Sequence, residues 1–501
     1  MADTKREIER KYEATTDTAV PDLTRVPGVA RVTDAGTTDL DAVYYDTPGL
    51  RLAAHSVTLR RRTGGADEGW HLKLPVSPGV RDEIAAPLAD EVPEALAALV
   101  RARTRGETLA PVVRLRSSRD VRHLLDDDGA LLAELSTDTV HAESLMDGGS
   151  TARWTEIEVE LADGGDPALL DAVEKRLRKA GIRPAASPSK LARALEETGT
   201  PPPAPRPAGP DDTAGAHVLA YLRAQTDKLL THDAGLRRDE PEALHDLRVA
   251  ARRLRSALRS HRKLLDRAAT DPLVHELRWL GRELGVDRDR EVLDARLRAA
   301  LDTVPRTLRL GPVHGRLRRW SAAHLAGSRG HLLEVLDSDR YLALLDRLDA
   351  FTADPPLRPA AAKSPDKVLA KVVLKEHARV AARVDRALAL DPGPDRDVAL
   401  HEARKAAKRA RYTAELAAPA LGGPARRLAK DMKALQRLLG DHQDSVVARR
   451  TLRELAVQAN GAGESSFTWG ILHAREEAEA AARERELPDT WARVRTRGIG
   501  G

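Results

Sequence analysis

The spacing of hydrophobic and polar positions changes once along the 501-residue chain. Before residue 199, short alternating runs are separated by turn-forming residues, a pattern typical of β-strands. After residue 216, long Ala-, Leu- and Arg-rich segments keep a helical period almost to the end. The pattern predicts an α+β domain followed by an all-α domain. The expected strands lie within Asp41–Tyr45, Val57–Arg62, Trp70–Leu74, Val112–Arg116, Leu131–Ser136 and Thr155–Leu161.

A segment rich in proline and glycine separates the two patterns. Residues 199–215 read GTPPPAPRPAGPDDTAG, a composition that favours an extended spacer. We therefore predict a first domain over residues 1–198 and a second over residues 216–501.

Charged residues repeat at every second position of the expected strands. Residues two apart share one face of a strand, so Glu7, Glu9 and Lys11 lie on one side. A single such strand is usually a solvated outer face, but several together favour the wet interior of a closed barrel. The same spacing aligns Arg60 with Arg62, His71 with Lys73, Arg81 with Glu83, Arg114 with Arg116, and Glu156 with Glu158 and Glu160.

An interior that carries both signs of charge suits a complex of a divalent cation with a phosphate chain. Hard divalent cations prefer carboxylate oxygens, whereas Arg and Lys neutralise phosphate oxygens. We interpret Tyr44 and Tyr45 as packing residues. His71 is expected to support the site, since oxygen-rich Mg²⁺ sites seldom use histidine. The chain has no cysteine and no recognisable Ser/His pair, so nothing indicates a covalent intermediate.

At these positions the chain resembles the CYTH family, the triphosphate tunnel metalloenzymes. Glu7, Glu9 and Lys11 match the family signature Glu-x-Glu-x-Lys, and the other family elements follow in order, which makes the match specific. Those elements are Tyr44-Tyr45-Asp46-Thr47, Arg60 and Arg62, Lys73, Arg114 and Arg116, Asp138, the glutamates of 156–160, and Ser189-Lys190-Leu191 with Arg193.

The resemblance implies an eight-stranded antiparallel β-tunnel that binds a triphosphate with Mg²⁺ or Mn²⁺. Catalysis would rest on Glu7, Glu9 and Lys11, with hydrolysis by in-line attack of water. Adenylate cyclase and thiamine triphosphatase chemistry use the same lining and stay open. The metal ligands would come from Glu7, Glu9, Asp138, Glu156, Glu158 and Glu160, of which the last three are not resolved further. The triphosphate would be bound by Lys11, Arg60, Arg62, Lys73, Arg114, Arg116, Lys190 and Arg193.

The second half contains a repeated basic helix. Residues 244–255 resemble residues 400–411, and in both a histidine is followed by bases three, seven and ten positions later. At helical spacing these residues form a stripe on one face. Leu247, Ala251, Leu254 and Leu258 lie on an adjacent face and are expected in the core. The stripes are His245, Arg248, Arg252 and Arg255, extended by Arg259 and Arg262, and His401, Arg404, Lys408 and Arg411.

A second repeated unit follows each stripe, over residues 276–293 and 431–448. It aligns Arg278 and Arg282 with Lys433 and Arg437. We expect helices to end at Gly285 and Gly440. Asp289 and Asp444 would then cap the following helices, since Asp is a preferred cap; the alternative is that they orient the stripes.

Aligned cations repel by roughly half a kcal/mol per i,i+4 pair, so an anion is expected to compensate. Aromatic residues make up 3% of the chain, which argues against base stacking and for a backbone-like polyanion. These motifs resemble the CHAD family, the conserved-histidine α-helical domain, over about Ala216–Trp491. The resemblance implies two pseudo-repeated helical bundles that bind inorganic polyphosphate. His245 and His401 are expected to bind phosphate and not metal, because cationic neighbours disfavour a bound cation.

Composition sets the remaining limits. Apolar residues make up 42% and charged residues 32%, with a net charge of +5, which suits a soluble globular protein. No apolar run approaches a membrane span, and residues 1–14 have no apolar signal core. We expect a cytoplasmic protein, associated with polyphosphate granules, with no membrane or nucleic-acid partner. A scaffold that binds polyphosphate without catalysis is the alternative of another class.

Overall fold

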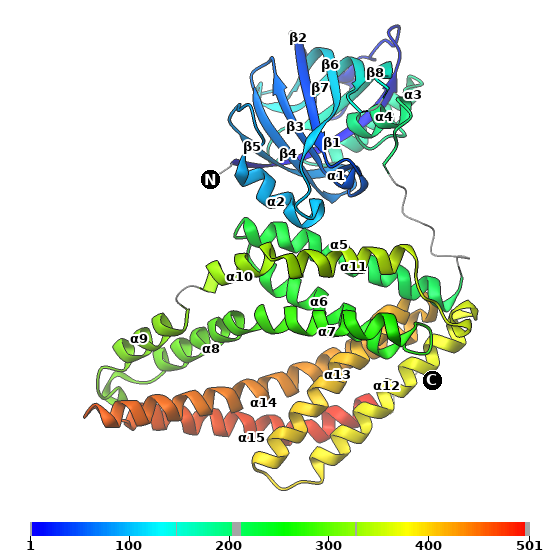
Figure 1. Ribbon diagram of the computed structural model, residues 1–501. Coiled ribbons are helices and arrows are strands. Elements are labelled where there is room, and N and C mark those ends of the chain that lie inside the picture. The colour runs from blue at the N-terminus through cyan, green and yellow to red at the C-terminus, as the bar shows by residue number, and fades with distance from the viewer. Residues whose placement is uncertain (1–2, 147, 203–211, 326–327, 496–501) are drawn as a thin grey trace. The chain divides into compact units, whose positions relative to one another are not determined.

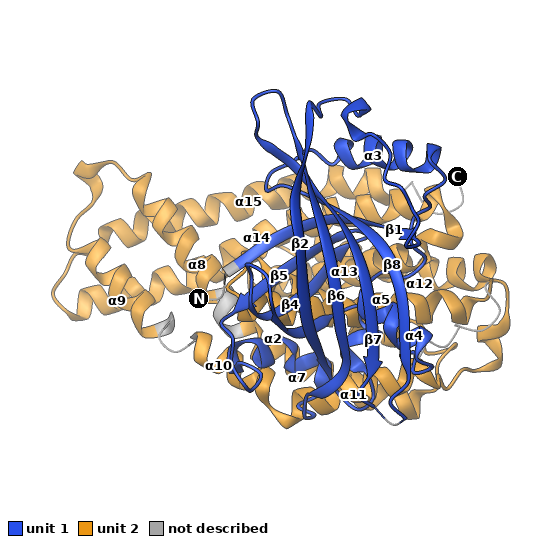
Figure 2. Cartoon of the chain, turned by 90° about the horizontal axis from the view of Figure 1, so that it is seen from above, with its two compact units in different colours: residues 1–205 blue, residues 206–501 orange. Residues whose placement is uncertain are grey.

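The computed structural model describes residues 3–146, 148–202, 212–325 and 328–495. The chain forms two compact units, Met1–Pro205 and Arg206–Gly501 (Figure 2). Residues 203–211 of the expected spacer lie outside the described residues.

The first unit is a closed barrel of eight antiparallel strands (Figure 1). Their order is β1-β5-β4-β3-β2-β6-β7-β8, and β8 pairs with β1 to complete the barrel. This architecture confirms the expected fold class. The strands are β1 (Asp3–Ala14), β2 (Arg31–Asp46), β3 (Thr58–Thr63), β4 (Gly69–Ser77), β5 (Val80–Ala86), β6 (Ala110–Leu125), β7 (Leu131–Ser144) and β8 (Thr151–Leu161).

Two strands are much longer than the hydrophobic pattern predicts. β2 begins ten residues before the expected Asp41, and β6 continues nine residues beyond Arg116. The added segments pair with each other from Arg31 opposite Leu125 onward. Their side chains are mostly exposed or half-buried, so backbone pairing extends these strands where side-chain burial leaves no alternating signal.

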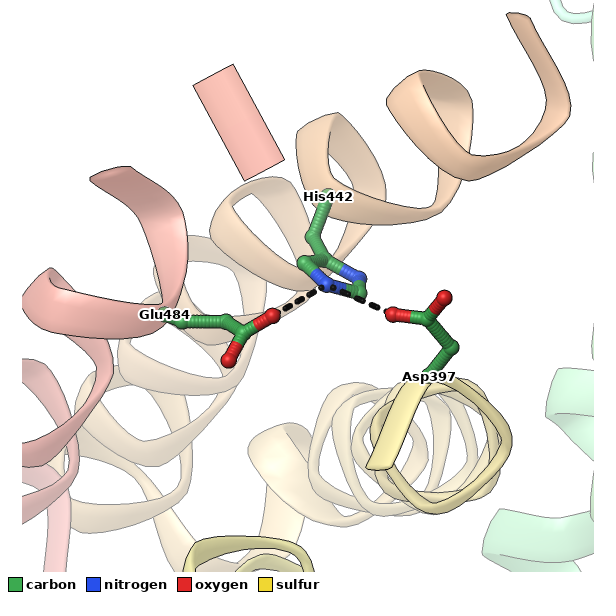
Figure 3. Close-up of side chains that lie close together, drawn as sticks. All are labelled: Asp397, His442 and Glu484. Atoms are coloured by element: carbon green, nitrogen blue, oxygen red, sulfur yellow. Dashed lines mark hydrogen bonds and ion pairs between the residues drawn. The ribbon is translucent and has the colours of Figure 1, made fainter. Parts of the chain in front are cut away.

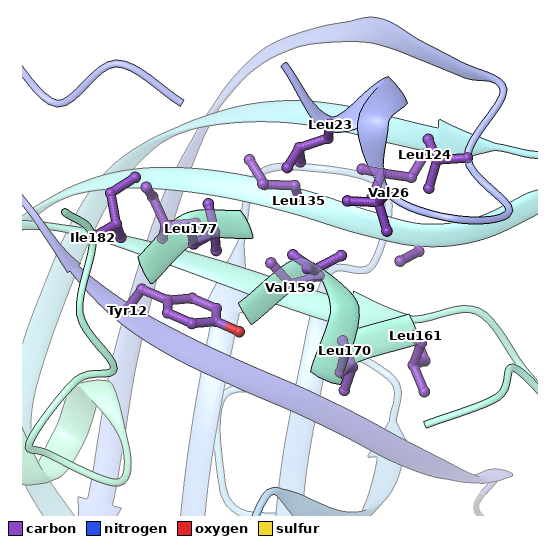
Figure 4. Packing of buried hydrophobic residues seen from close by; sticks show 14 residues of the cluster. Tyr12, Leu23, Val26, Leu124, Leu135, Val159, Leu161, Leu170, Leu177 and Ile182 are labelled. Atoms are coloured by element: carbon purple, nitrogen blue, oxygen red, sulfur yellow. The ribbon is translucent and has the colours of Figure 1, made fainter. Parts of the chain in front are cut away.

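Apolar side chains cover part of the outside of this barrel. Ile157 and Val159 of β8 alternate with the charged residues of that strand and pack beneath α3 (Ala168–Lys179) (Figure 4). Leu170 and Leu177 of α3 complete the contact. The apolar face therefore points outward to a helix, and the charged face points inward. The other helices of this unit are η1 (Leu23–Arg25), α1 (Arg51–Ala54), α2 (Glu94–Thr104) and α4 (Lys190–Glu197).

One end of the barrel interior is apolar. Val113 and Leu115 of β6 and Val140 of β7 form a buried cluster with Leu191 and Leu195 of α4. Helix α4 begins at Ser189, whose hydroxyl accepts a hydrogen bond from the Ala192 backbone N–H, a common N-cap arrangement. This cap places Lys190, the first residue of α4, in the charged part of the interior.

The described residues of the second unit form helices joined by loops, with one isolated β-bridge between Leu265 and Leu357. Leu247, Ala251, Leu254 and Leu258 are buried, which confirms the expected core face. Among the described helices, none is both long and apolar enough to cross a lipid bilayer. The helices are α5 (Ala214–Arg237), α6 (Ala243–Ser260), α7 (Arg267–Glu283), α8 (Gly285–Asp302), η2 (Arg306–Leu308), α9 (Val313–Leu325), α10 (Ser328–Asp337), α11 (Asp339–Ala353), η3 (Pro359–Ala362), α12 (Pro365–Leu388), α13 (Pro394–Leu421), α14 (Gly423–Gly461) and α15 (Phe467–Arg495).

The expected helix ends are right in one repeat and wrong in the other. Helix α7 ends at Glu283 and α8 begins at Gly285. Gly440, by contrast, lies inside α14, which is continuous through it. Asp444 is therefore not a helix cap. Burial raises the pKa of its carboxyl group, and the nearby Arg404 guanidinium partly opposes this rise. The side chain of Asp289 lies outside the described residues.

Candidate functional site: a charged tunnel and a basic helical surface

The barrel contains a cavity of about 600 Å³. Eight Lys or Arg residues and seven Asp or Glu residues line it. The two signs nearly cancel, so the lining alone does not neutralise a strongly anionic ligand. A phosphate chain with several negative charges would need cations as well, and carboxylates in the same cavity offer them oxygen ligands.

Three buried carboxylates gather inside the barrel, and one of them, Glu158, lines the cavity. Oxygens of Asp138, Glu156 and Glu158 all lie within 4.8 Å of one another, and we call these residues the carboxylate cluster. The Lys190 amino group contacts all three, at 2.9, 3.0 and 2.5 Å. Arg119 donates two hydrogen bonds of 2.8 Å to Asp138 and one of 2.9 Å to Glu158.

These contacts keep the groups of this cluster ionised. Burial alone would raise the pKa of Asp138 and of Glu158, but Lys190 and Arg119, with Lys11 also acting on Glu158, lower both pKa values below their usual range. Burial would lower the pKa of Lys190, but the three carboxylates outweigh it and raise this pKa. Basic groups thus occupy the position between three carboxylates that a divalent cation would take in a loaded site.

One wall of the cavity carries a second set of paired charges. The amino group of Lys73 lies 2.7 and 2.6 Å from the two carboxyl oxygens of Glu7 and 3.8 Å from Glu83. Burial raises the pKa of Glu7 to about 7, although Lys73 acts in the other direction. His71 lies 2.6 Å from Glu83 and so supports the wall as expected.

Arginine side chains complete this wall. Arg60 lies within 3.5 Å of the Tyr44 hydroxyl, and Arg62 pairs with Asp67. Burial, together with Arg60 and Arg119 nearby, lowers the pKa of Arg62 to about 9. Among the described residues, the buried Nε atoms of Arg60 and Arg62 have no hydrogen-bond acceptor. Such donors are normally satisfied, so an anionic ligand would complete them.

The structure brings most of the expected tunnel residues together. Tyr44 lines the cavity, whereas Tyr45 packs on Trp70 with ring centroids 4.8 Å apart. Asp138 and Glu156 belong to the carboxylate cluster. The expected residues that line the cavity are Glu7, Glu9, Lys11, Arg60, Arg62, Lys73, Glu158, Glu160 and Lys190.

Three expected triphosphate ligands lie elsewhere. Arg114 pairs with Asp41 at 2.5 Å, and Arg116 lies on the same outer face with its side chain 59% exposed. In this part of β6 the side chains that point into the barrel are those of Val113 and Leu115. Arg193 pairs with Glu13 and Glu197 and lies over the ring of Trp154.

Sequence reasoning missed Arg119. It lies six residues after Val113 and therefore shares its inward face. The alternation of apolar and polar residues that marks β6 in the sequence stops near residue 116. Extending the two-residue period beyond that point would have placed Arg119 on the inward face.

The two repeats of the helical unit share one contact. The Arg248 guanidinium lies next to Gly285, and the Arg404 guanidinium lies next to Gly440. The first arginine of each stripe therefore contacts the glycine of the repeated unit that follows it. Glycine leaves room for the planar group there, because it carries no side chain.

The stripes meet further basic residues from other helices. Burial, with Arg278, Arg252 and Arg409 nearby, lowers the pKa of Arg255. The pKa of Arg259 is lowered in the same way by burial and by Arg262, Arg255, Arg278 and Arg379. We call the set drawn from α6, α7, α12 and α13 the arginine cluster: Arg255, Arg259, Arg262, Arg278, Arg379 and Arg409. Arg379 and Arg409 were not predicted, because they lie outside the repeated spacing.

The other stripe residues have varied surroundings. Arg411 donates a hydrogen bond of 2.7 Å to Glu415, so an acidic side chain of the same helix already compensates this end of the stripe. The pKa of His401 is lowered by burial and by the nearby cations Lys405 and Arg404. Arg248, Arg252, Arg404 and Lys408 are half-buried, whereas His245, Arg282, Lys433 and Arg437 are exposed.

The fold and the site define a two-domain protein with a charged β-tunnel and a basic helical domain. Residues 5–195 match the CYTH domain and residues 220–453 match the CHAD domain. The chain belongs to these two families, and its tunnel is that of the triphosphate tunnel family.

Individual relatives match nearly the whole chain or somewhat more than half of it. Uncharacterized protein Rv2226 of Mycobacterium tuberculosis is 39% identical over 498 residues, which cover 96% of this chain and 94% of the relative. PptA from Streptomyces chartreusis is 24% identical, over 56% of this chain and 99% of that one, with a TM-score of 0.48. The CHAD domain from the plant Ricinus communis is 26% identical, over 57% and 92%, with a TM-score of 0.45.

Proposed function

We propose that the tunnel domain hydrolyses inorganic triphosphate, or a closely related triphosphate, with Mg²⁺ or Mn²⁺, and that the helical domain binds inorganic polyphosphate. The observation that carries the first part is the carboxylate cluster in contact with Arg and Lys residues inside one closed barrel. Membership of the triphosphate tunnel family supports it.

The donor set of the tunnel fits a hard divalent cation. The candidate ligands are all carboxylates: Glu7, Glu9 and Glu158 line the cavity, and Asp138 and Glu156 lie within 4.8 Å of Glu158. Mg²⁺ and Mn²⁺ prefer such oxygen ligands. When bound, the cation would neutralise phosphate charge and favour ionisation of a water molecule. Glu160 pairs with Lys5 at 2.8 Å, and both side chains are more exposed than those of the cluster, so we assign Glu160 to the tunnel entrance.

The side chains of the tunnel position the phosphates. Lys11, Lys73 and Lys190 now contact carboxylates, and phosphate oxygens would replace those partners. Arg60 and Arg62 would donate their free Nε–H groups to the same chain. This arrangement fixes the terminal phosphorus and stabilises the charge that develops on its oxygens, which is the main demand of phosphoryl transfer.

The cavity favours a phosphate chain over a nucleotide. Apart from His71, Tyr44 is the one aromatic residue among the described residues that line it, and its hydroxyl is already close to Arg60. Leu40, Val121 and Leu131 are among the other uncharged lining residues. Aliphatic groups offer no hydrogen bonds to a purine and no flat surface for stacking.

The arginine cluster carries the second part of the proposal. Glu376 is the acidic group that acts on Arg409, and it also pairs with Arg379 at 2.8 Å. Among the described residues, the buried Nε atoms of Arg262 in this cluster and of the stripe residue Arg404 have no hydrogen-bond acceptor. Crowded cations with unsatisfied donors favour an extended polyanion.

One comparison of substrates tests the proposal. The full chain is supplied with inorganic triphosphate, ATP, thiamine triphosphate and long-chain polyphosphate, each with Mg²⁺ or Mn²⁺, and released phosphate and cyclic AMP are measured. We expect phosphate from inorganic triphosphate, faster than from ATP. Cyclic AMP as the main product from ATP would favour a cyclase, and binding without turnover would favour the scaffold.

A further inference from the structure

Three side chains from three helices converge in the helical unit, away from the arginine cluster. They are Asp397 in the first turn of α13, His442 in α14 and Glu484 in α15 (Figure 3). The Nε2 atom of His442 lies 3.3 Å from a carboxyl oxygen of Asp397 and 3.2 Å from one of Glu484. We call this set the imidazole–carboxylate cluster.

Each carboxylate is oriented by an arginine through its other oxygen. Arg449 contacts Asp397 Oδ2 at 3.2 Å, and Arg396 contacts Glu484 Oε2 at 3.0 Å. The remaining oxygens, Oδ1 and Oε1, both point to the same ring nitrogen. Outer partners that orient the ligating groups in this way are typical of metal sites.

The distances are long for a simple ion pair. A single charge-assisted hydrogen bond to a carboxylate would be about 2.7–2.9 Å long, whereas one N–H shared between both carboxylates would give longer distances such as these. Ligand atoms at corners of a tetrahedron with bonds of about 2.0 Å lie about 3.3 Å apart. The two measured N···O distances agree with that edge, and all three candidate ligand atoms lie within 4.8 Å of one another.

We propose that Asp397, His442 and Glu484 bind a divalent transition-metal cation of the zinc class, with the fourth position left to water. An imidazole nitrogen with two carboxylate oxygens suits Zn²⁺ and Co²⁺ better than Mg²⁺. His442 is 1% exposed, whereas the side chains of Asp397 and Glu484 are 20% and 14% exposed, so the cation would enter from the carboxylate side.

A bound cation would cross-link α15 to α13 and α14. Glu484 lies beyond residues 220–453, the segment that matches the CHAD domain, so the cation would bind a helix that this match does not include. The role is structural, and it does not rest on the proposed hydrolysis in the tunnel.

Metal titration of the full chain tests the site. Protein freed of metal by a chelator is titrated with Zn²⁺ by calorimetry and with Co²⁺ by visible absorption, which is strong for four-coordinate cobalt and weak for a six-coordinate oxygen site such as the tunnel would provide. The wild type should bind one Zn²⁺ with the four-coordinate cobalt spectrum. Its Tm should rise by roughly 5 °C when free Zn²⁺ is a hundred times its Kd.

Matched variants decide the assignment. Glu484→Gln and Asp397→Asn should each weaken Zn²⁺ binding at least about a hundredfold and lose the cobalt spectrum. Glu479→Gln, on the same helix but paired with Arg483, should bind Zn²⁺ like the wild type. The proposal is overturned if the wild type binds no Zn²⁺, if Glu484→Gln binds it unchanged, or if the four-coordinate spectrum disappears in Glu7→Gln/Glu9→Gln. His442→Phe should also lose Zn²⁺ binding if it folds. If it does not fold, Glu484→Gln and Asp397→Asn still test the proposal, because they change no side-chain shape.

Discussion

Replacing Arg119 with glutamine should abolish most tunnel activity, whereas Arg114→Gln, on the same strand, should not. Arg119 makes three hydrogen bonds of 2.8–2.9 Å to Asp138 and Glu158, and its side chain is 20% exposed. Removing a cation from a buried pair costs about 3–5 kcal/mol. Lys190 still contacts both carboxylates, so we take the lower end, about 3 kcal/mol of stability.

The effect on rate has a separate cause. In the proposed function Arg119 would donate to the phosphate oxygens on which charge develops, and losing one such donor typically lowers kcat about a hundredfold to a thousandfold. Arg114 instead pairs with Asp41 on the outer face and is 38% exposed, and an exposed pair contributes at most about 1 kcal/mol. We expect Arg114→Gln to stay within about threefold of the wild-type rate.

Phosphate release from inorganic triphosphate with saturating Mn²⁺ measures both variants, after circular dichroism and thermal melting have confirmed that each is folded. Equal losses in the two variants, or a larger loss in Arg114→Gln, would refute the assignment of Arg119 to the inner face. A folded Arg119→Gln with the wild-type rate would remove Arg119 from the catalytic site.

The remaining predictions concern metal, polyanion and pH. Glu9→Ala should lower triphosphate hydrolysis at least about a hundredfold, and excess chelator should stop the wild type; full activity in chelator would contradict the metal role. Arg255→Gln/Arg259→Gln should weaken polyphosphate binding and flatten its salt dependence, whereas Arg475→Gln should do neither; equal weakening would indicate diffuse attraction. Burial lowers the pKa of His261 from 6.5 to about 4, so the unfolded chain takes up a proton that the native chain excludes. Stability measured by denaturant titration should therefore fall by up to about 3 kcal/mol as the pH drops from 6.5 towards 4, and His261→Asn should remove most of that fall.

Local patterns in the sequence predicted the order of the two domains and most of the charged residues that line the cavity. Alternation over two residues and periodicity over three or four are properties of near neighbours in the chain, so they can be read without a fold. Glu7, Glu9 and Lys11 lie on one face of β1 for this reason and line the cavity. The core face of α6 was predicted on the same basis, and it is buried.

Which charged side chains come into contact depends on how the strands and helices pack in three dimensions. Local alternation shows that Arg114 and Arg116 share a face, but barrel closure decides whether that face is inside, and it places Arg119 there instead. The end of α7 next to Gly285 and the continuity of α14 through Gly440 differ although the motifs match, because packing overrides a local stop signal. The convergence of Arg255, Arg379 and Arg409, like that of Asp397, His442 and Glu484, joins helices far apart in the chain. Such meetings depend on how whole helices pack, and no spacing within one segment encodes them.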